Sequence, residues 1–130
     1  MKKKNIIFYD AYCALCDKSI TWILENDDEN KFQFCHFKSD FAKSSLKNNF
    51  KTDSVSVLTN EGEIVSKSDA TIFILNTLKK YRSFNIVLKI IPKKLRDFFY
   101  DIIAKNRYKW FGKFDYCKVP SPKWRKKFIE

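Results

Sequence analysis

Hydrophobic and polar positions change their period along the chain, and each period predicts a type of element. Ile6–Tyr9 is a short apolar run that predicts a buried strand. From Cys13 the apolar residues recur at helical spacing, which predicts a helix that ends in the polar segment Asn26–Asn30. In Phe32–Phe37, the residues Phe32, Phe34 and His36 alternate with Gln33, Cys35 and Phe37, a pattern that predicts a second strand. A second helix, capped at residues 39–40, is expected up to about residue 50.

The middle of the chain predicts a hairpin and a covering helix. Ser54–Thr59 and Ile64–Lys67 read as strands, and the turn between them contains Gly62, which tolerates positive φ. Ser68 and Asp69 are expected to cap the next helix. The resulting order β-α-β-α-β-β-α predicts an α/β fold, a thioredoxin-like mixed sheet with flanking helices.

The remainder reads as a helical, aromatic-rich C-terminal extension. Helices are predicted over Ile86–Ile91 and Lys93–Tyr108, and the apolar stripe of the second is expected in the core. The stripe consists of Leu95, Phe98, Phe99, Ile102 and Ile103. The segment after Lys109 is expected to wrap irregularly on the domain, with a short last helix from about Pro122. Arg107, Trp110 and Phe111 are interpreted as its anchor.

Composition supports one domain over residues 1–130, in which 1–80 form the sheet-containing core and 81–130 a basic helical extension packed on it. The chain has 130 residues, of which 45% are hydrophobic, and only 2 Gly and 3 Pro, which excludes low-complexity segments. Its apolar runs are too short for a signal peptide or a spanning helix, so we expect a cytoplasmic protein. Cysteines there are rarely structural disulfides.

Positive charge is concentrated at the C-terminal end. Of the 26 Lys and Arg residues, 14 lie in residues 81–130, against 4 of the 15 acidic residues. Such a surface suits acidic partners, nucleic acid or an anionic membrane, but a solvated basic face is the simpler interpretation. We disfavour nucleic-acid and membrane binding, because Phe98, Phe99, Ile102 and Ile103 are expected in the core.

Candidate chemistry lies in the Cys-x-x-Cys formed by Cys13 and Cys16. Cys13 falls where a strand ends and a helix begins, and the unpaired amides of a first helical turn stabilise a thiolate. Cys16 follows one turn later, on the same side and within disulfide reach. The spacing predicts that Cys13 attacks a disulfide and that Cys16 resolves the mixed disulfide. Two helical cysteines that are neighbours by chance remain an alternative.

A zinc site is a weaker interpretation. Cys35, His36 and Cys117 would have to join the pair, but their spacing fits no zinc ribbon or finger. We favour packing roles for all three residues, although Cys117 could be a third redox thiol. No metal is therefore expected, and no organic cofactor is expected because the dithiol itself holds the electrons.

The chain resembles the thiol-disulfide oxidoreductase DCC family, which is named for its Asp-x-x-Cys-x-x-Cys motif. The motif here is Asp10-Ala11-Tyr12-Cys13-Ala14-Leu15-Cys16, after the letters IIFY. Two further segments, Lys67–Ala70 and Ile91–Phe128, are also similar to the family, so that the resemblance covers nearly the whole chain in order. It implies a thioredoxin-like fold and dithiol–disulfide exchange.

The sequence departs from related patterns at two places. The family usually has glycine where this chain has Ala11. Alanine restricts the backbone of the turn more than glycine does, but both thiols are retained. Thioredoxins place a cis-proline before the strand that faces the cysteines, whereas residues 51–54 contain no proline. We expect trans peptides there and a narrower substrate range.

Asp10 has two open interpretations. Its carboxylate could take a proton from Cys16 during resolution, or it could stiffen the strand-to-helix turn. The expected partners are a protein or small-molecule disulfide and a cellular reductant. A non-catalytic thioredoxin-like binding module that uses the basic C-terminal face is the alternative function.

Overall fold

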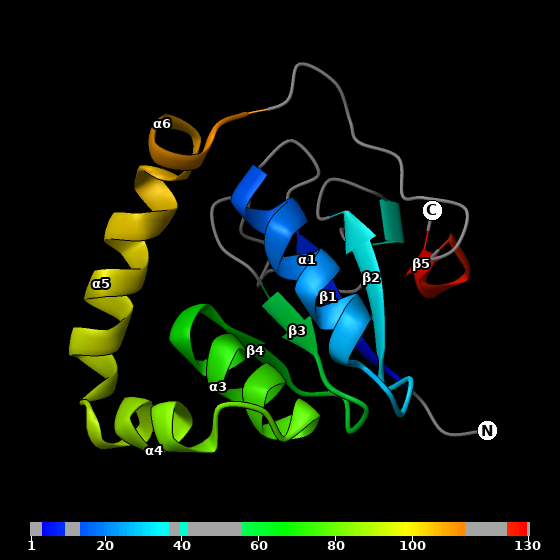
Figure 1. Ribbon diagram of the computed structural model, residues 1–130, viewed down its shortest axis with the longest axis horizontal. Helices are drawn as coiled ribbons and strands as arrows, with labels where there is room; N and C mark the ends of the chain where they lie inside the picture. The colour runs from blue at the N-terminus through cyan, green and yellow to red at the C-terminus, as the bar shows by residue number, and fades with distance from the viewer. Residues whose placement is uncertain (1–3, 10–13, 37–39, 42–55, 114–124, 130) are drawn as a thin grey trace.

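A computed structural model describes residues 4–9, 14–36, 40–41, 56–113 and 125–129. A five-stranded sheet in the order β4-β3-β1-β2-β5 forms its centre (Figure 1). The strands are β1 (Asn5–Tyr9), β2 (Phe32–His36), β3 (Ser56–Leu58), β4 (Ile64–Ser66) and β5 (Phe128–Ile129). The helices are α1 (Ala14–Asn26), α3 (Lys67–Leu78), α4 (Arg82–Ile90), α5 (Lys93–Lys105) and α6 (Arg107–Phe111).

The sheet is mixed, as predicted. β1 runs parallel to β2 and antiparallel to β3, and β3 forms the predicted hairpin with β4. Gly62 in the hairpin turn has a φ of 90°, the conformation for which glycine is suited. Its amide donates to Thr59 O at 2.9 Å. The strand order and the crossover through α1 confirm the thioredoxin-like α/β fold.

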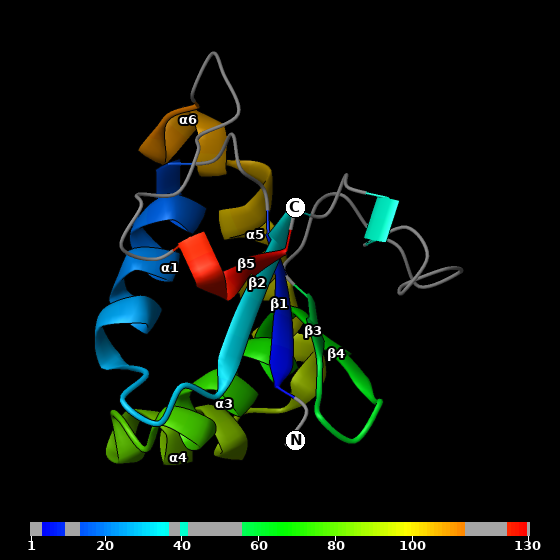
Figure 2. The ribbon, with the colours of Figure 1, turned by 90° about the vertical axis from the view of Figure 1, so that its right-hand side faces the viewer.

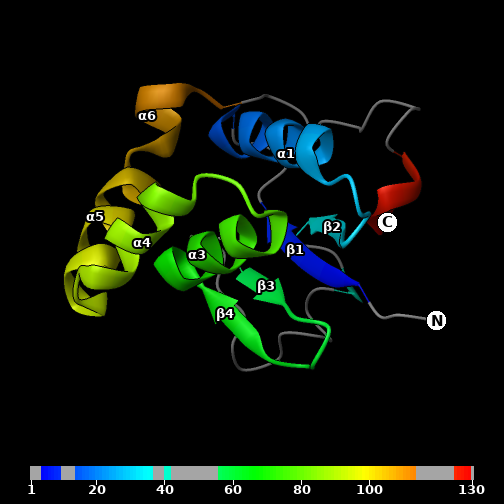
Figure 3. The same cartoon turned by 60° about the horizontal axis from the view of Figure 1, so that its bottom comes forward.

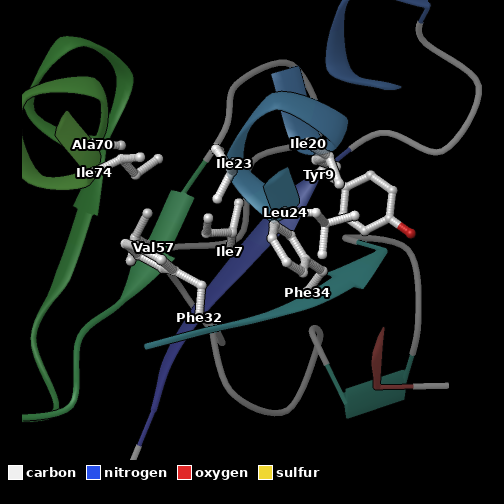
Figure 4. Close-up of a cluster of buried hydrophobic side chains, with 10 residues drawn as sticks. All are labelled: Ile7, Tyr9, Ile20, Ile23, Leu24, Phe32, Phe34, Val57, Ala70 and Ile74. Carbon is white, nitrogen blue, oxygen red and sulfur yellow. The ribbon is translucent and has the colours of Figure 1, made fainter. Parts of the chain in front are cut away.

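The main core lies between the sheet and the helices α1 and α3. Figure 4 shows Ile20, Ile23 and Leu24 of α1 pointing toward the strands, as their helical spacing predicted. Ala70 and Ile74 of α3 cover the β3 side of the same cluster. The strands contribute Ile7, Tyr9, Phe32, Phe34 and Val57.

A buried carboxylate ends α1 and starts β2. Asp27 follows the last residue of α1 and is buried. Its two oxygens accept hydrogen bonds from Lys31 N at 2.8 Å and from Phe32 N at 3.0 Å. The side chain therefore satisfies backbone donors that have no helical or sheet partner at this turn.

The second face of the sheet carries a smaller apolar cluster. Phe8 and Cys35 are fully buried there, because alternate residues of a strand point to opposite faces. Phe41 packs over Phe8, with ring centroids 6.4 Å apart. Residues 40–41 are helical, in agreement with the helix expected at that point, and the rest of that helix lies outside the described residues. Figure 2 shows α1 and residues 40–41 on opposite sides of the sheet.

The C-terminal helices differ from the prediction in one important respect. The expected Lys93–Tyr108 helix is divided at Asn106 into α5 and α6. The expectation that its apolar stripe is in the core is wrong, because Leu95, Phe98, Phe99 and Ile103 are exposed and Ile102 is only partly buried. Trp110 and Phe111, which were interpreted with Arg107 as the anchor of the C-terminal segment, are exposed as well. Polar contacts described below turn the stripe outward.

The chain returns to the sheet at its C-terminal end. A 3₁₀ turn at Arg125–Lys127 precedes β5, which pairs in parallel with β2. Phe128 stacks on Phe34 at 5.2 Å between ring centroids, so this residue lies against β2. The sequence predicted a short helix here and not the strand. Residues 114–124, which include Cys117 and Pro122, lie outside the described residues.

Candidate active site

The first helix begins where the motif predicted it. β1 ends at Tyr9 and α1 begins at Ala14. Cys16 lies in the first turn of α1 and is partly buried. Asp10 and Cys13 fall between the two elements and lie outside the described residues, so their positions stay predictions.

A second helix begins at the same edge of the sheet. Phe8 near the end of β1 pairs with Ser56, and Ser56 pairs with Ser66 at the end of β4. α3 begins directly after Ser66. The N-terminal ends of α1 and α3 therefore face the same side of the molecule, and each contributes the positive end of a helix dipole.

His36 occupies the neighbouring strand end. It pairs with Tyr9 across the β1–β2 ladder, and its Nδ1 lies 3.2 Å from Tyr9 O. The two rings are tilted at 6.1 Å between centroids. These contacts agree with the predicted packing role at a strand end, and they place the imidazole beside the residue that precedes Asp10.

Cys35 is separated from Cys16 by the sheet. Its side chain is fully buried with Phe8 on the face opposite α1. The packing role predicted for Cys35 is confirmed by this position. No cluster of three or more metal-binding side chains occurs in the described ranges, which omit Cys13 and Cys117.

The start of α3 makes a polar connection to α5 that sequence reasoning missed. Ser68 and Asp69 were expected to cap α3, but the cap position is Ser66 and both residues lie inside the first turn. The Ser68 hydroxyl donates to the carboxylate of Asp97. Asp69 accepts from Lys93 Nζ at 2.6 Å and from Arg96 Nη1 at 3.2 Å.

These contacts change the acidity of the groups involved. The hydrogen bond from Lys93 is the largest influence on Asp69 and holds the pKa of its carboxyl below the ordinary value of 3.8, with further help from Arg96. In turn, Asp69 raises the pKa of the Lys93 ammonium above 10.5. Both groups are therefore charged across the neutral range.

A third pair completes the attachment of α5. Lys67 Nζ lies 3.1 Å from a carboxylate oxygen of Asp101, one helical turn after Asp97. The segments Lys67–Asp69 and Lys93–Asp101 both contain acidic and basic residues. This was the sequence signal that could have predicted the contact between α3 and α5. The spacing alone did not reveal it, because the two segments are separated by α4.

The helix α6 lies beside the start of α1. The two helices are in contact, and Figure 3 shows α6 next to the N-terminal end of α1. Arg107 of α6 places its guanidinium 4.9 Å from the ring centroid of Tyr108. Three segments of the chain resemble the DCC family, and their described parts are the start of α1, the start of α3, and α5 with α6. These parts lie at or next to the edge of the sheet where β1 and β4 end.

The chain is similar to known proteins over most of its length. Residues 7–113 match the family model described as DCC1-like thiol-disulfide oxidoreductase. The chain is 33% identical over 128 residues to Uncharacterized protein YuxK of Bacillus subtilis (strain 168), which covers 96% of this chain and 93% of the relative. It is 27% identical over 121 residues to the DCC family protein At1g52590, chloroplastic, of Arabidopsis thaliana, with 90% and 70% covered. No solved structure matches the chain. The chain therefore belongs to the DCC1-like thiol-disulfide oxidoreductase family.

Proposed function

We propose that this protein exchanges thiols and disulfides with Cys13 as the nucleophile and Cys16 as the resolving thiol. The observation that supports the proposal is the position of Cys16, partly buried in the first turn of a helix that follows the central strand β1. Cys13 is three positions earlier in the sequence and directly precedes Ala14, the first residue of α1. The amides in the first turn of a helix lack internal partners. The adjacent start of α3 adds a second positive helix end to the same edge.

The proposed reaction has two exchange steps. The Cys13 thiolate attacks one sulfur of a substrate disulfide, so that a mixed disulfide forms and the other substrate sulfur leaves and takes a proton. Cys16, after losing its proton, attacks the Cys13 sulfur and releases the second substrate thiol. The substrate is reduced by two electrons, and the protein is left with a Cys13–Cys16 disulfide.

Asp10 has a supporting role in this scheme. Its carboxylate accepts the proton of Cys16 during the second step, or it holds the turn between β1 and α1. A thiol reductant of the cytoplasm restores the dithiol, and protein or small-molecule disulfides are the substrates. No organic cofactor is needed, because the dithiol holds both electrons.

Trapping of mixed disulfides tests the proposal. Cys16→Ser is expected to accumulate a covalent adduct with a disulfide substrate, and Cys13→Ser is expected to form none and to lose insulin reduction. Cys35→Ala is the matched control, since Cys35 is buried on the other face of the sheet. If neither motif cysteine affects reduction or trapping, the non-catalytic binding module replaces this proposal.

The acidity of Cys13 provides a second test. The rate of alkylation against pH is expected to give a Cys13 pKa well below the ordinary cysteine value of about 8.5. Cys16→Ser/Cys117→Ser isolates the signal of Cys13, because the remaining cysteine, Cys35, is fully buried. A value at or above the ordinary one contradicts a thiolate stabilised by the start of α1.

A further inference from the structure

Exposed apolar side chains are confined to one part of the molecule. Among the described residues, every large hydrophobic side chain that is exposed lies between residues 81 and 111. The set consists of Tyr81, Phe84, Ile86, Val87, Ile90, Leu95, Phe98, Phe99, Ile103, Tyr108, Trp110 and Phe111. Scattered exposed apolar residues need no explanation, but a concentration of this size marks an interaction surface.

The helix α5 is oriented with its apolar face outward. Its polar residues Arg96, Asp97 and Asp101 turn toward α3, where they bind the residues at the start of that helix. The side chain of Arg96 is only 11% exposed, whereas Phe98 on the other face is 58% exposed. Globular helices normally bury the apolar stripe, so α5 has the reverse arrangement.

The helix α4 repeats the pattern. Asn85 is its buried residue, with 5% of its surface exposed. Ile86, Val87 and Ile90 are exposed, and Ile90 reaches 76%. Two consecutive helices thus expose apolar side chains. Both helices lie on the side of α3 away from the sheet (Figures 1 and 3).

The charge around these side chains has one sign. Six exposed cations lie on α4, α5 and α6, of which Lys93 is paired with Asp69: Arg82, Lys89, Lys93, Lys94, Lys105 and Lys109. The acidic residues in 81–113 are Asp97 and Asp101, and both are engaged with the start of α3. The outer side of α4 and α5 is therefore apolar and cationic.

We propose that α4 and α5 dock on the surface of an anionic lipid bilayer. Exposed aliphatic and aromatic side chains enter the boundary between headgroups and acyl chains, while lysine side chains bind the anionic headgroups. The expectation that disfavoured a membrane surface depended on these side chains being in the core, which the structure contradicts. The inference does not depend on the thiol chemistry.

Charge and side-chain type favour a lipid surface over a second copy of the chain and over single-stranded nucleic acid. A second copy of the chain would bring the same positive charge to the interface, which opposes association. Single-stranded nucleic acid would stack on the exposed aromatic side chains, but it would leave the aliphatic side chains of Ile86, Val87 and Ile90 without an apolar partner. An anionic bilayer satisfies both the cationic and the aliphatic residues.

Vesicle sedimentation with the full chain tests the proposal. Binding to phosphatidylcholine vesicles with about 30 mol % phosphatidylglycerol is expected to be about tenfold stronger than to phosphatidylcholine alone, and to weaken in high salt. Ile90→Ser/Phe98→Ser/Phe99→Ser is expected to lose binding by about tenfold or more. These side chains are exposed, so circular dichroism should show an unchanged fold.

Two double variants, each of which removes two lysine charges, distinguish binding through this surface from nonspecific electrostatic binding. Lys89→Gln/Lys94→Gln changes the proposed surface and is expected to weaken binding severalfold. Lys18→Gln/Lys126→Gln removes the same charge elsewhere and should bind as the unmodified chain does. Absence of vesicle binding, or equal binding by the serine variant, overturns the proposal. A dimer in sedimentation velocity that the serine variant abolishes, without vesicle binding, would assign the surface to a second copy instead.

Discussion

Arg96 on α5 faces Asp69 on α3, with 3.2 Å between Nη1 and Oδ1. The guanidinium is nearly buried, and its Nε also donates to Ile91 O at 3.0 Å. One side chain therefore joins the end of α4, the start of α5 and the start of α3. This connection fixes which face of α5 points to the outside.

Asp69→Asn is expected to lower stability at neutral pH. The change removes the charge that binds Arg96 and Lys93, and about 1 kcal/mol of unfolding free energy is a reasonable loss for a partly exposed site. Urea unfolding measures it. Glu61→Gln in the exposed hairpin turn is the control and should cost less than about 0.5 kcal/mol.

The effect of Asp69→Asn should depend on pH. Because the pKa of Asp69 is lowered in the folded state, its stabilisation is present above the ordinary value of 3.8 and is lost as pH falls through the lower folded value. The difference between the variant and the unmodified chain should therefore shrink in acid below pH 3.8. A difference that stays constant from neutral pH into this range would contradict the ion-pair explanation.

Asp27→Asn is expected to destabilise the protein by about 2 kcal/mol. The buried carboxylate accepts two backbone hydrogen bonds, and an amide can accept only one of them while its NH₂ group opposes the other donor. The neighbouring Asp28 is exposed, so Asp28→Asn is the matched control with little expected effect. Equal unfolding midpoints for the two variants would show that Asp27 does not stabilise the turn.

Asn85→Ala is expected to be neutral or stabilising, by up to about 1 kcal/mol or about 3 °C in Tm. Within the described part of the chain, the buried Oδ1 of Asn85 has no hydrogen-bond partner, so truncation removes an unsatisfied acceptor. Part of any gain comes from the helix propensity of alanine. Asn76→Ala on the exposed face of α3 measures that part, and a clear loss of stability for Asn85→Ala alone would refute this explanation.

Cys35→Ala is expected to lower stability by about 1–2 kcal/mol and to leave disulfide exchange unchanged. The thiol is fully buried against Phe8 on the face opposite α1. Thermal unfolding and insulin reduction on the same preparation separate the two effects. Loss of exchange in a folded Cys35→Ala variant would place this sulfur in the chemistry.

Local patterns predicted the sheet well because they decide local structure. The alternation in Phe32–Phe37, the hairpin turn at Gly62 and the helical spacing after Cys13 each require only neighbouring residues. The Cys-x-x-Cys spacing after a predicted strand gave Cys13 and Cys16 as site residues, and the family motif includes both of them together with Asp10. Cys16 lies in the first turn of α1, and its role stays a prediction, as do those of Asp10 and Cys13.

Long-range contacts decided what the patterns missed. Periodicity shows that α5 has an apolar face, but not whether that face meets the core. The bonds from Ser68 and Asp69 to Asp97, Lys93 and Arg96 settle the question, and they join segments more than 20 residues apart in sequence. β5 was missed because a two-residue strand has no measurable alternation and depends on pairing with β2.

The polar attachment of α5 to α3 has a consequence for local motion. Detaching a helix that already exposes its apolar stripe uncovers little additional apolar surface, so this opening changes heat capacity and denaturant sensitivity only slightly. Amide hydrogen exchange along α5 should then proceed by a small-scale opening that urea scarcely promotes, while exchange in β1 requires global unfolding. The sheet can thus stay intact while α5 detaches from α3 and binds again.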